Sequence, residues 1–192
     1  MSRVKEFDET EVLDQALELF RARGFKHTSF ADLVEALGVS RQSLYDTYGD
    51  KQALYQTALK RYLDRGLEMM RRKLEDTAPI RELLTDLFDG MIEGQCANGS
   101  PGCLMVNSMV EMSPHDADTR ALAQTHAREL EGLFTSRLSA AQRKGEIAKS
   151  KDPVALARYF YHTILGLAVA SRALGAKENL RQTARLSLQV LD

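Results

Sequence analysis

The sequence predicts an all-α protein of about nine helices, in which three short N-terminal helices precede a larger helical domain. Apolar residues recur along most of the chain at the i, i+3, i+4, i+7 spacing of a helix, and only four prolines interrupt it. The β-branched alternation typical of strands is almost absent. With 192 residues, the chain is long enough for one or two domains with a real core. We expect two domains, spanning residues 1–50 and residues 51–192.

The composition favours a soluble globular protein. Apolar residues make up 44% of the chain and charged residues 28%, and the formal net charge is −1. The N-terminal segment MSRVKEFDET lacks the hydrophobic stretch of a secretory signal. We found no apolar run that approaches the roughly 20 residues needed to span a bilayer. We therefore expect a cytoplasmic protein without a membrane partner.

The first helix is predicted between Asp8 and Gly24. Asp8 is a typical N-cap with Glu11 three residues later, and Gly24 ends the helix. Acidic residues at its start and arginines at its end match the helix dipole. Its buried face is formed by Val12, Leu13, Ala16, Leu17 and Phe20. This helix is expected to support its neighbours rather than to contact DNA bases.

Residues 29–48 have the layout of a helix-turn-helix. Ser29 is a candidate N-cap with Asp32 three residues later, and the apolar face that follows comprises Phe30, Leu33, Val34 and Leu37. Gly38 can take the left-handed C-cap conformation, and Ser40 caps the next helix. In a helix-turn-helix this second helix lies in the DNA major groove. The alternative is an ordinary αα-hairpin without a role in DNA binding.

The exposed residues of the second helix favour DNA binding over a simple hairpin. All of them have side chains that can form hydrogen bonds, and all lie near the N-terminus of this helix: Ser40, Arg41, Gln42, Ser43, Asp46 and Thr47. Arg suits the O6 and N7 atoms of guanine, Gln suits the N6 and N7 atoms of adenine, and Ser or Thr suits bases or phosphates. Lys51, Tyr45 and Tyr48 are candidate phosphate contacts, although packing alone would also explain the two rings.

This part of the chain resembles the DNA-binding domain of the TetR family of bacterial transcriptional regulators. The resemblance covers residues 9 to about 60 and rests on Ala16, Leu19, Phe20, Gly24, Phe25, Thr28, Ser29, Gly38, Val39, Ser40, Leu44, Tyr45, Tyr48, Lys51, Ala53 and Leu54. It adds Thr28 and Ser29 to the expected DNA contacts. Two departures lie on the recognition helix, where Gln42 replaces a usual small residue and Asp46-Thr47 a usual aromatic pair. The family's operator sequences therefore do not transfer to this chain.

Six further helices are predicted after Gly49. They are expected at about residues 51–75, 80–96, 103–112, 116–145, 153–174 and 178–191. Asp50 and the pair Asp152-Pro153 mark helix starts, and Gly175 marks a helix end. The long helix after Asp50 joins the N-terminal helices to the rest of the chain.

The last two long helices carry more apolar surface than one subunit can easily bury. The helix at residues 153–174 is apolar on most of its faces, and the last helix has apolar residues at heptad-like spacing. In TetR-like proteins the last two long helices pair with those of a second subunit, which implies a homodimer; a monomeric core is the alternative. A two-fold dimer would place two recognition helices on the half-sites of a pseudo-palindromic, double-stranded DNA operator.

The resemblance also implies a pocket for a small-molecule effector in the C-terminal domain. The candidate lining residues are Phe88, Met91, Cys103, Met105, Met109, Phe134 and His162. Methionines are flexible and suit adaptable pockets, but residues of these types also form ordinary cores.

Cys103 offers a second sensing chemistry. The run GCLMVNSMVEM, residues 102–112, is similar to a subset of TetR-like regulators in which the cysteine takes part in sensing electrophiles or oxidants. A thiol at a helix N-terminus has a lowered pKa and reacts more readily. Cys96 lies seven residues earlier, so a disulfide is conceivable, and two inert cysteines are the alternative. Cys96, Cys103 and His115 match no standard metal-ligand spacing, so we expect no metal and no cofactor.

The sequence as a whole favours a dimeric transcription regulator, most simply a repressor released from its operator by an effector. No HExxH, GxSxG, phosphate-loop or dinucleotide-binding motif is present, so an enzyme is not expected. The charge of residues 1–60 is the main counter-argument, because eight Lys and Arg stand against ten Asp and Glu. A helical ligand-binding module that does not bind DNA is therefore the rival interpretation.

Overall fold

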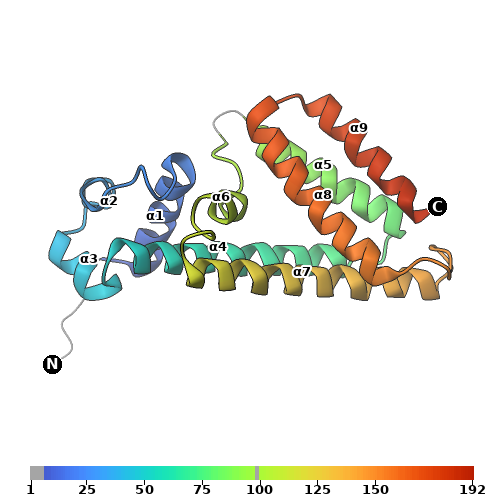
Figure 1. Ribbon diagram of the computed structural model, residues 1–192, viewed down its shortest axis with the longest axis horizontal. Coiled ribbons are helices and arrows are strands. Elements are labelled where there is room, and N and C mark those ends of the chain that lie inside the picture. Colours follow the sequence, from blue (N-terminus) through green and yellow to red (C-terminus); the bar gives the residue numbers. More distant parts are fainter. Residues whose placement is uncertain (1–6, 98–99) are drawn as a thin grey trace.

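The computed structural model describes residues 7–97 and 100–192, and all regular structure in these two segments is helical (Figure 1). The elements are α1 (Glu9–Arg23), α2 (Phe30–Leu37), α3 (Arg41–Tyr48), α4 (Lys51–Leu74), α5 (Ile80–Gln95), α6 (Leu104–Glu111), α7 (Ala117–Arg143), α8 (Pro153–Leu174), α9 (Lys177–Ser187) and a final 3-10 turn, η1 (Leu188–Leu191). The prediction of an all-α chain, with a helix-turn-helix followed by a larger helical part, is confirmed.

The N-terminal helices begin and end at the residues that the sequence indicated. Asp8 Oδ1 accepts hydrogen bonds from two N–H groups in the first turn of α1, at 2.7 and 3.3 Å. Ser29 and Asp32 form a reciprocal capping box: Ser29 Oγ accepts from the Asp32 N–H at 3.1 Å, and Asp32 Oδ2 accepts from the Ser29 N–H at 2.7 Å. Gly38 has a φ of 62°, the left-handed conformation that ends α2 before the turn.

Two hydrophobic cores organise the molecule, and the first lies among α1, α2, α3, the first half of α4 and α6. At its centre the ring of Tyr55 packs edge to face against Phe20 and Phe25, with centroid distances of 5.0 and 4.9 Å. Leu33 of α2 and Leu44 of α3 are fully buried in the same core. Their burial fixes α2 and α3 relative to each other and to α4.

The second core lies among α5, α7, α8, α9 and the second half of α4, and contains the fully buried rings of Phe88, Phe134 and Phe160. α4 and α7 run side by side along the long axis of the molecule, and α5, α8 and α9 gather at the end away from α3 (Figure 1). Leu63 of α4 belongs to the first core and Leu67 to the second. The expected domain boundary after residue 50 therefore falls at the start of a helix that both cores share.

Some helix ends differ slightly from the sequence expectation. α5 ends at Gln95, one residue earlier than expected, and Cys103 precedes α6 as its N-cap residue instead of lying within it. The last α-helix begins at Lys177, and Leu188–Leu191 tighten into the 3-10 turn. The order of the elements is unaffected.

α8 corrects one expectation from the sequence. It is long enough, and with a mean hydropathy of 1.2 apolar enough, to meet the length and composition criteria for a membrane span. In the structure it packs against α5, α7 and α9, and Phe160 and Leu167 on its inner face are buried. A single such helix is weak evidence for a membrane; burial in the second core accounts for part of its composition, since 39% of its most apolar window is buried.

Asp14 ties α1 to the middle of α4. Its carboxylate accepts hydrogen bonds from Arg61 Nε at 2.8 Å and from Arg65 Nη1 at 2.6 Å, and each arginine donates a second bond. The guanidinium groups of Arg61 and Arg65 hold the pKa of Asp14 well below its usual range. A carboxyl group of this kind stabilises the fold above its unfolded pKa of about 3.9, and the contribution is lost as the pH falls toward the folded-state pKa.

We predict that Asp14→Asn lowers the free energy of unfolding at pH 7 by about 1 kcal/mol, a modest loss because solvent screens these partly exposed ion pairs. The difference from the unchanged protein should shrink below about pH 4, where the unfolded carboxylate takes up its proton. Urea unfolding at pH 7 and pH 3 measures both effects. Asp64→Asn is the control, because Asp64 pairs with the exposed Lys60 on its own helix. Equal losses of unfolding free energy in Asp14→Asn and Asp64→Asn would contradict a special role for the pairing of Asp14 with two arginines.

Candidate nucleic-acid interface and ligand cleft

α3 lies at one end of the molecule (Figure 1), and the residues on its outer face are exposed and polar. Ser40 caps the helix, since its Oγ accepts a hydrogen bond from the Ser43 N–H at 3.1 Å. Leu44 anchors the inner side of the helix in the first core, which leaves the other side to solvent. The solvent-facing set comprises Arg41, Gln42, Tyr45 and Asp46, with Ser43 and Thr47 half-buried at its edge. A helix exposed in this way can enter a DNA major groove.

The start of α2 supports the two largest side chains of this face. The guanidinium carbon of Arg41 lies 5.2 Å from the centre of the Phe30 ring, and the centre of the Tyr45 ring lies 5.4 Å from the centre of the Phe30 ring. One turn apart on α3, Gln42 Nε2 donates a hydrogen bond to Asp46 Oδ1 at 2.7 Å. Contact between Gln42 and an adenine edge therefore requires this bond to be exchanged for a bond to the base.

Ser29 and Thr28, both expected to contact DNA, differ in their exposure to solvent. Ser29 is exposed at the N-terminus of α2, where a phosphate can approach free backbone donors. Thr28 is fully buried, and its Oγ1 donates to the Gly24 carbonyl at 2.7 Å. Its side chain holds the turn between α1 and α2 together. Because it does not reach the surface, we remove Thr28 from the expected DNA contacts.

Lys51 and Tyr48 are already engaged within the N-terminal helices. Lys51 Nζ donates to the carbonyls of Phe25 and Thr28 at 3.0 and 2.9 Å, and lies 3.9 Å from the centre of the Phe25 ring. An ammonium group has three donors, so one is left for a phosphate. The Tyr48 hydroxyl donates to the Glu9 carbonyl at 3.1 Å, and burial raises the pKa of Tyr48 to about 12. Both side chains hold the N-terminal helices together; packing was the stated alternative for Tyr48, whereas no sequence signal had indicated it for Lys51.

The residues expected to line an effector pocket are divided between the two cores. The second core holds Phe88, Met91 and Phe134. The first core holds Cys103, Met105 and Met109. His162 is exposed on α8. Phe88 and Phe134 are fully buried core residues, and Cys103 lines an open cleft.

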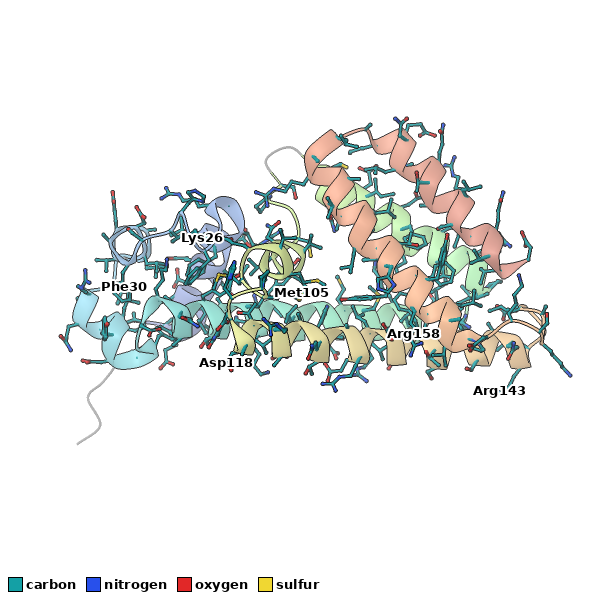
Figure 2. The ribbon with its side chains drawn as sticks, in the orientation of Figure 1. Lys26, Phe30, Met105, Asp118, Arg143 and Arg158 are labelled. Carbon is teal, nitrogen blue, oxygen red and sulfur yellow. The ribbon has the colours of Figure 1, made fainter. Side chains whose placement is uncertain are left out.

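This cleft has a volume of about 660 Å³ and lies where the turn between α1 and α2 meets α6 and the C-terminal part of α8. Its apolar lining comprises Val106, Val110, Ala168, Val169 and Ala173. Its basic lining comprises Arg23, Lys26, His27 and Arg172. Figure 2 places Lys26 on the flank of the N-terminal helices that is next to α6. The cleft is thus shared between the N-terminal helices and the C-terminal domain.

Glu111 fastens α6 to the turn between α1 and α2. Its carboxylate accepts hydrogen bonds from the N–H groups of Phe25 at 3.1 Å and Lys26 at 2.7 Å. Gly24 has a φ of 81°, and a Cβ at this position would lie 3.0 Å from Glu111 Oε2. Glycine thus allows both the backbone conformation and the approach of the carboxylate. Just before the N-terminal end of α6, the carbonyl of Gly102 accepts a hydrogen bond from Arg21 Nη2 at 3.0 Å.

Cys103 stands at the N-cap position of α6 and is partly exposed. The hydroxyl of Tyr62 donates to its Sγ at a distance of 3.6 Å, and burial raises the pKa of Tyr62. Cys96 and Cys103 are both free thiols, so the conceivable disulfide is not formed. Within residues 7–97 and 100–192, no cluster of three or more His, Cys, Asp or Glu side chains is arranged to hold a metal ion.

Comparison with protein families gives two matches. The family described as bacterial regulatory proteins, tetR family, matches residues 12–58, and the family described as tetracyclin repressor-like, C-terminal domain, matches residues 78–186. The two matches together include the helix-turn-helix and most of the C-terminal helices.

Individual proteins give consistent matches. The chain is 34% identical over 194 residues to the uncharacterised HTH-type transcriptional regulator YezE of Bacillus subtilis (strain 168), with 100% of both chains covered. It is 31% identical over 191 residues to the HTH-type transcriptional repressor ComR of Escherichia coli (strain K12), covering 98% of this chain and 90% of ComR. A solved structure of a cysteine mutant of the TetR family regulator CifR, complexed with 26-bp double-strand operator DNA, matches with a TM-score of 0.88 and 26% identity. That match covers 99% of this chain and 100% of the CifR chain.

We predict that Glu111→Gln loosens the contact between α6 and the turn between α1 and α2. A neutral amide offers one acceptor oxygen and turns its NH₂ group toward the second N–H, so about 1–2 kcal/mol of local stability is lost. Hydrogen exchange at the Phe25 and Lys26 amides should accelerate roughly 5- to 30-fold. Glu129→Gln, at an exposed position on α7, is the matched control. Unchanged exchange at both amides would show that the carboxylate does not hold the turn.

Proposed function

The chain belongs to the TetR family of bacterial transcriptional regulators, and on that premise we propose that it is a homodimeric repressor that leaves its DNA operator when an effector binds. Its relative ComR is a repressor, and the CifR structure contains operator DNA, which supports DNA as the partner. The observation that carries the proposal is the exposed polar face of α3, held on a fully packed core by Leu44. A DNA partner also favours the bacterial cytoplasm as the place of action.

The proposed DNA contacts are those that the structure leaves at or near the surface. Contacts to bases are proposed for Ser40, Arg41, Gln42, Ser43, Asp46 and Thr47. Contacts to phosphates are proposed for Ser29, Tyr45, Tyr48 and Lys51. Lys51 would act through the one donor that its two carbonyl bonds leave free.

Exposed apolar side chains on α8 and α9 support assembly into a homodimer. The exposed set outside the cleft comprises Val154, Tyr159, Leu174 and Leu186. A single subunit leaves this surface in water, whereas a second copy related by two-fold symmetry would cover it. The same symmetry would present two copies of α3 to the half-sites of a pseudo-palindromic operator, about one helical turn apart.

α4 supplies a mechanical route for release. It belongs to both cores, so a shift of its C-terminal half relative to the second core is carried to the helix-turn-helix. An effector changes DNA affinity only if it binds two arrangements of the protein unequally. A small change in the separation of the two α3 helices then prevents both from docking on their half-sites together.

A thiol-responsive regulator is the second candidate, and the position of Cys103 favours it. The thiol is partly exposed at the start of α6 and borders the cleft that the two domains share. Covalent modification there would place a new group between α6 and the N-terminal helices.

The remaining rival is a helical ligand-binding module that does not bind DNA. It would require the exposed polar face of α3 to have no partner.

We predict that selection from random duplex DNA at near-physiological salt will enrich a pseudo-palindromic sequence with two half-sites. Arg41→Ala should weaken binding to the selected DNA by about 1–3 kcal/mol, roughly 5- to 100-fold, because a bidentate base contact is lost. Arg143→Ala, which removes an exposed charge at the far end of α7, is the control (Figure 2). Absence of enrichment by folded, dimeric protein would favour the rival without DNA binding.

For the thiol candidate, we predict that N-ethylmaleimide lowers the affinity of the unchanged protein for the selected DNA, and that Cys103→Ser removes the effect. The reagent alkylates accessible thiols, and Cys103 lies where the adduct would disturb α6. Cys96→Ser is the matched control, because Cys96 lies at the C-terminal end of α5. Full retention of DNA affinity after complete alkylation of Cys103, measured by mass spectrometry, would exclude thiol-based release.

A further inference from the structure

We propose that the cleft between the α1–α2 turn, α6 and α8 binds a small carboxylate with an apolar tail. The inference deepens the proposed function, on which its regulatory meaning rests, by giving the effector a place and a chemical class. Binding itself does not require DNA, so the two proposals can fail separately. The site differs from the core positions expected from the sequence, with which it shares Cys103.

The apolar part of the cleft is unusually open to water. Val110 of α6 is 75% exposed and Val169 of α8 is 51% exposed, and both line the cleft. Val106 and Ala168 continue the apolar surface inward, where they are buried. Isolated exposed valines are common on proteins, but here they face a shared concavity of about 660 Å³. An apolar ligand chain would remove these side chains from water without any change in the fold.

Positive charge comes from both walls of the cleft. Arg23 and Lys26 belong to the N-terminal helices and their turn, and Arg172 belongs to α8. Arg23 has a weak ion pair with Asp32 at 3.6 Å, while Lys26 and Arg172 have no ion pair among the residues that the structure describes. Two unpaired cations that line one concavity, one from the turn before α2 and one from α8, favour an anion there.

Glu111 is the acidic residue of the lining, and its position limits its effect on an anionic ligand. Its two carboxylate oxygens already accept the N–H groups of Phe25 and Lys26. Those bonds offset part of its charge and turn the oxygens toward the backbone of the turn. The cations therefore outweigh the one compensated carboxylate, and the cleft disfavours a ligand that carries a positive charge.

The volume of the cleft sets an upper limit on the size of the ligand. A cavity of about 660 Å³ lies in the usual range for small-molecule sites, about 300–1,000 Å³. It accommodates an acyl chain of about ten carbons with its carboxylate between the two walls. The chain would follow the apolar residues of α6 and α8.

The location gives such a ligand a regulatory effect, if the proposed function holds. A carboxylate that contacts both Lys26 and Arg172 links the turn before α2 to α8, and so favours one arrangement of the two domains. The affinity of the ligand for the free protein then differs from its affinity for the DNA-bound protein. By reciprocity, DNA changes the affinity for the ligand by the same factor as the ligand changes the affinity for DNA.

Isothermal titration calorimetry of the full-length protein, without DNA, tests the site with three probes of equal chain length. We expect saturable binding of decanoate, below its micelle concentration, with one site per subunit. Decyltrimethylammonium has the same tail and the opposite charge, and should not bind at the site. Decan-1-ol, which has no charge, should bind at least tenfold more weakly than decanoate, the fold-change that corresponds to about 1.4 kcal/mol.

Two substitutions test the walls of the cleft. Arg172→Ala should weaken decanoate binding about tenfold or more, and Val110→Asp should abolish it by placing a like charge against the ligand. Both side chains are exposed, so the fold should be retained, and circular dichroism checks this. Arg143→Ala is the matched control, since this exposed arginine lies far from the cleft (Figure 2).

The outcomes separate the two proposals. Unchanged decanoate affinity in Arg172→Ala and Val110→Asp, or equal binding of decyltrimethylammonium, would overturn the cleft as an anion site. A change of oligomeric state in these two variants, measured by analytical ultracentrifugation, would also overturn it, because the cleft would then be a contact between subunits. Decanoate binding that depends on Arg172, with no operator selected from random DNA, would support the cleft and contradict the repressor.

Discussion

The continuity of α4 through both hydrophobic cores is the constraint on which the rest of the structure depends. Its first half supplies Tyr55 to the aromatic centre beneath the helix-turn-helix, and its second half supplies Leu67 and Leu74 to the core with α5 and α7. A helix of 24 residues that is packed along its whole length moves as a rod. A rearrangement of the C-terminal helices therefore either carries α2 and α3 with it or breaks close packing around α4.

α6 gives the N-terminal helices a second point of attachment. Like α4, it packs side chains into the first core, Leu104 and Met105 among them, and it adds polar bonds made by Glu111 and by Arg21. Such bonds exchange with water at little net cost, while separating packed rings costs much more. The cleft adjoins these polar bonds, so binding or modification there would act on the contact between α6 and the turn before α2 while both cores stay packed.

The fold could be predicted from the sequence because its signals act over a few residues. Ser29 and Gly38 each satisfy groups of their own helix, so their roles follow from spacing alone. The site could be predicted only in part, because its other bonds join distant positions. Glu111 meets the turn 85 residues earlier in the chain, and nothing near it in sequence marks that partner. In a sequence, an aromatic or methionine residue of a core cannot be told from one that lines a pocket. Phe134, for example, lies in the second core.

Gln42 and Asp46 are bonded to each other on the face of α3 that would meet DNA. Gln42 gives up this partner without loss only where a base edge replaces it, and the carboxylate of Asp46 then needs a donor such as the amino group of cytosine. A base without a matching edge leaves the two side chains bonded to each other but strips water from the carboxylate, which costs free energy. α3 would therefore select its operator chiefly by rejecting poor matches, and gain little extra affinity from good ones. A regulator built in this way would occupy few chromosomal sites, each of them with moderate strength.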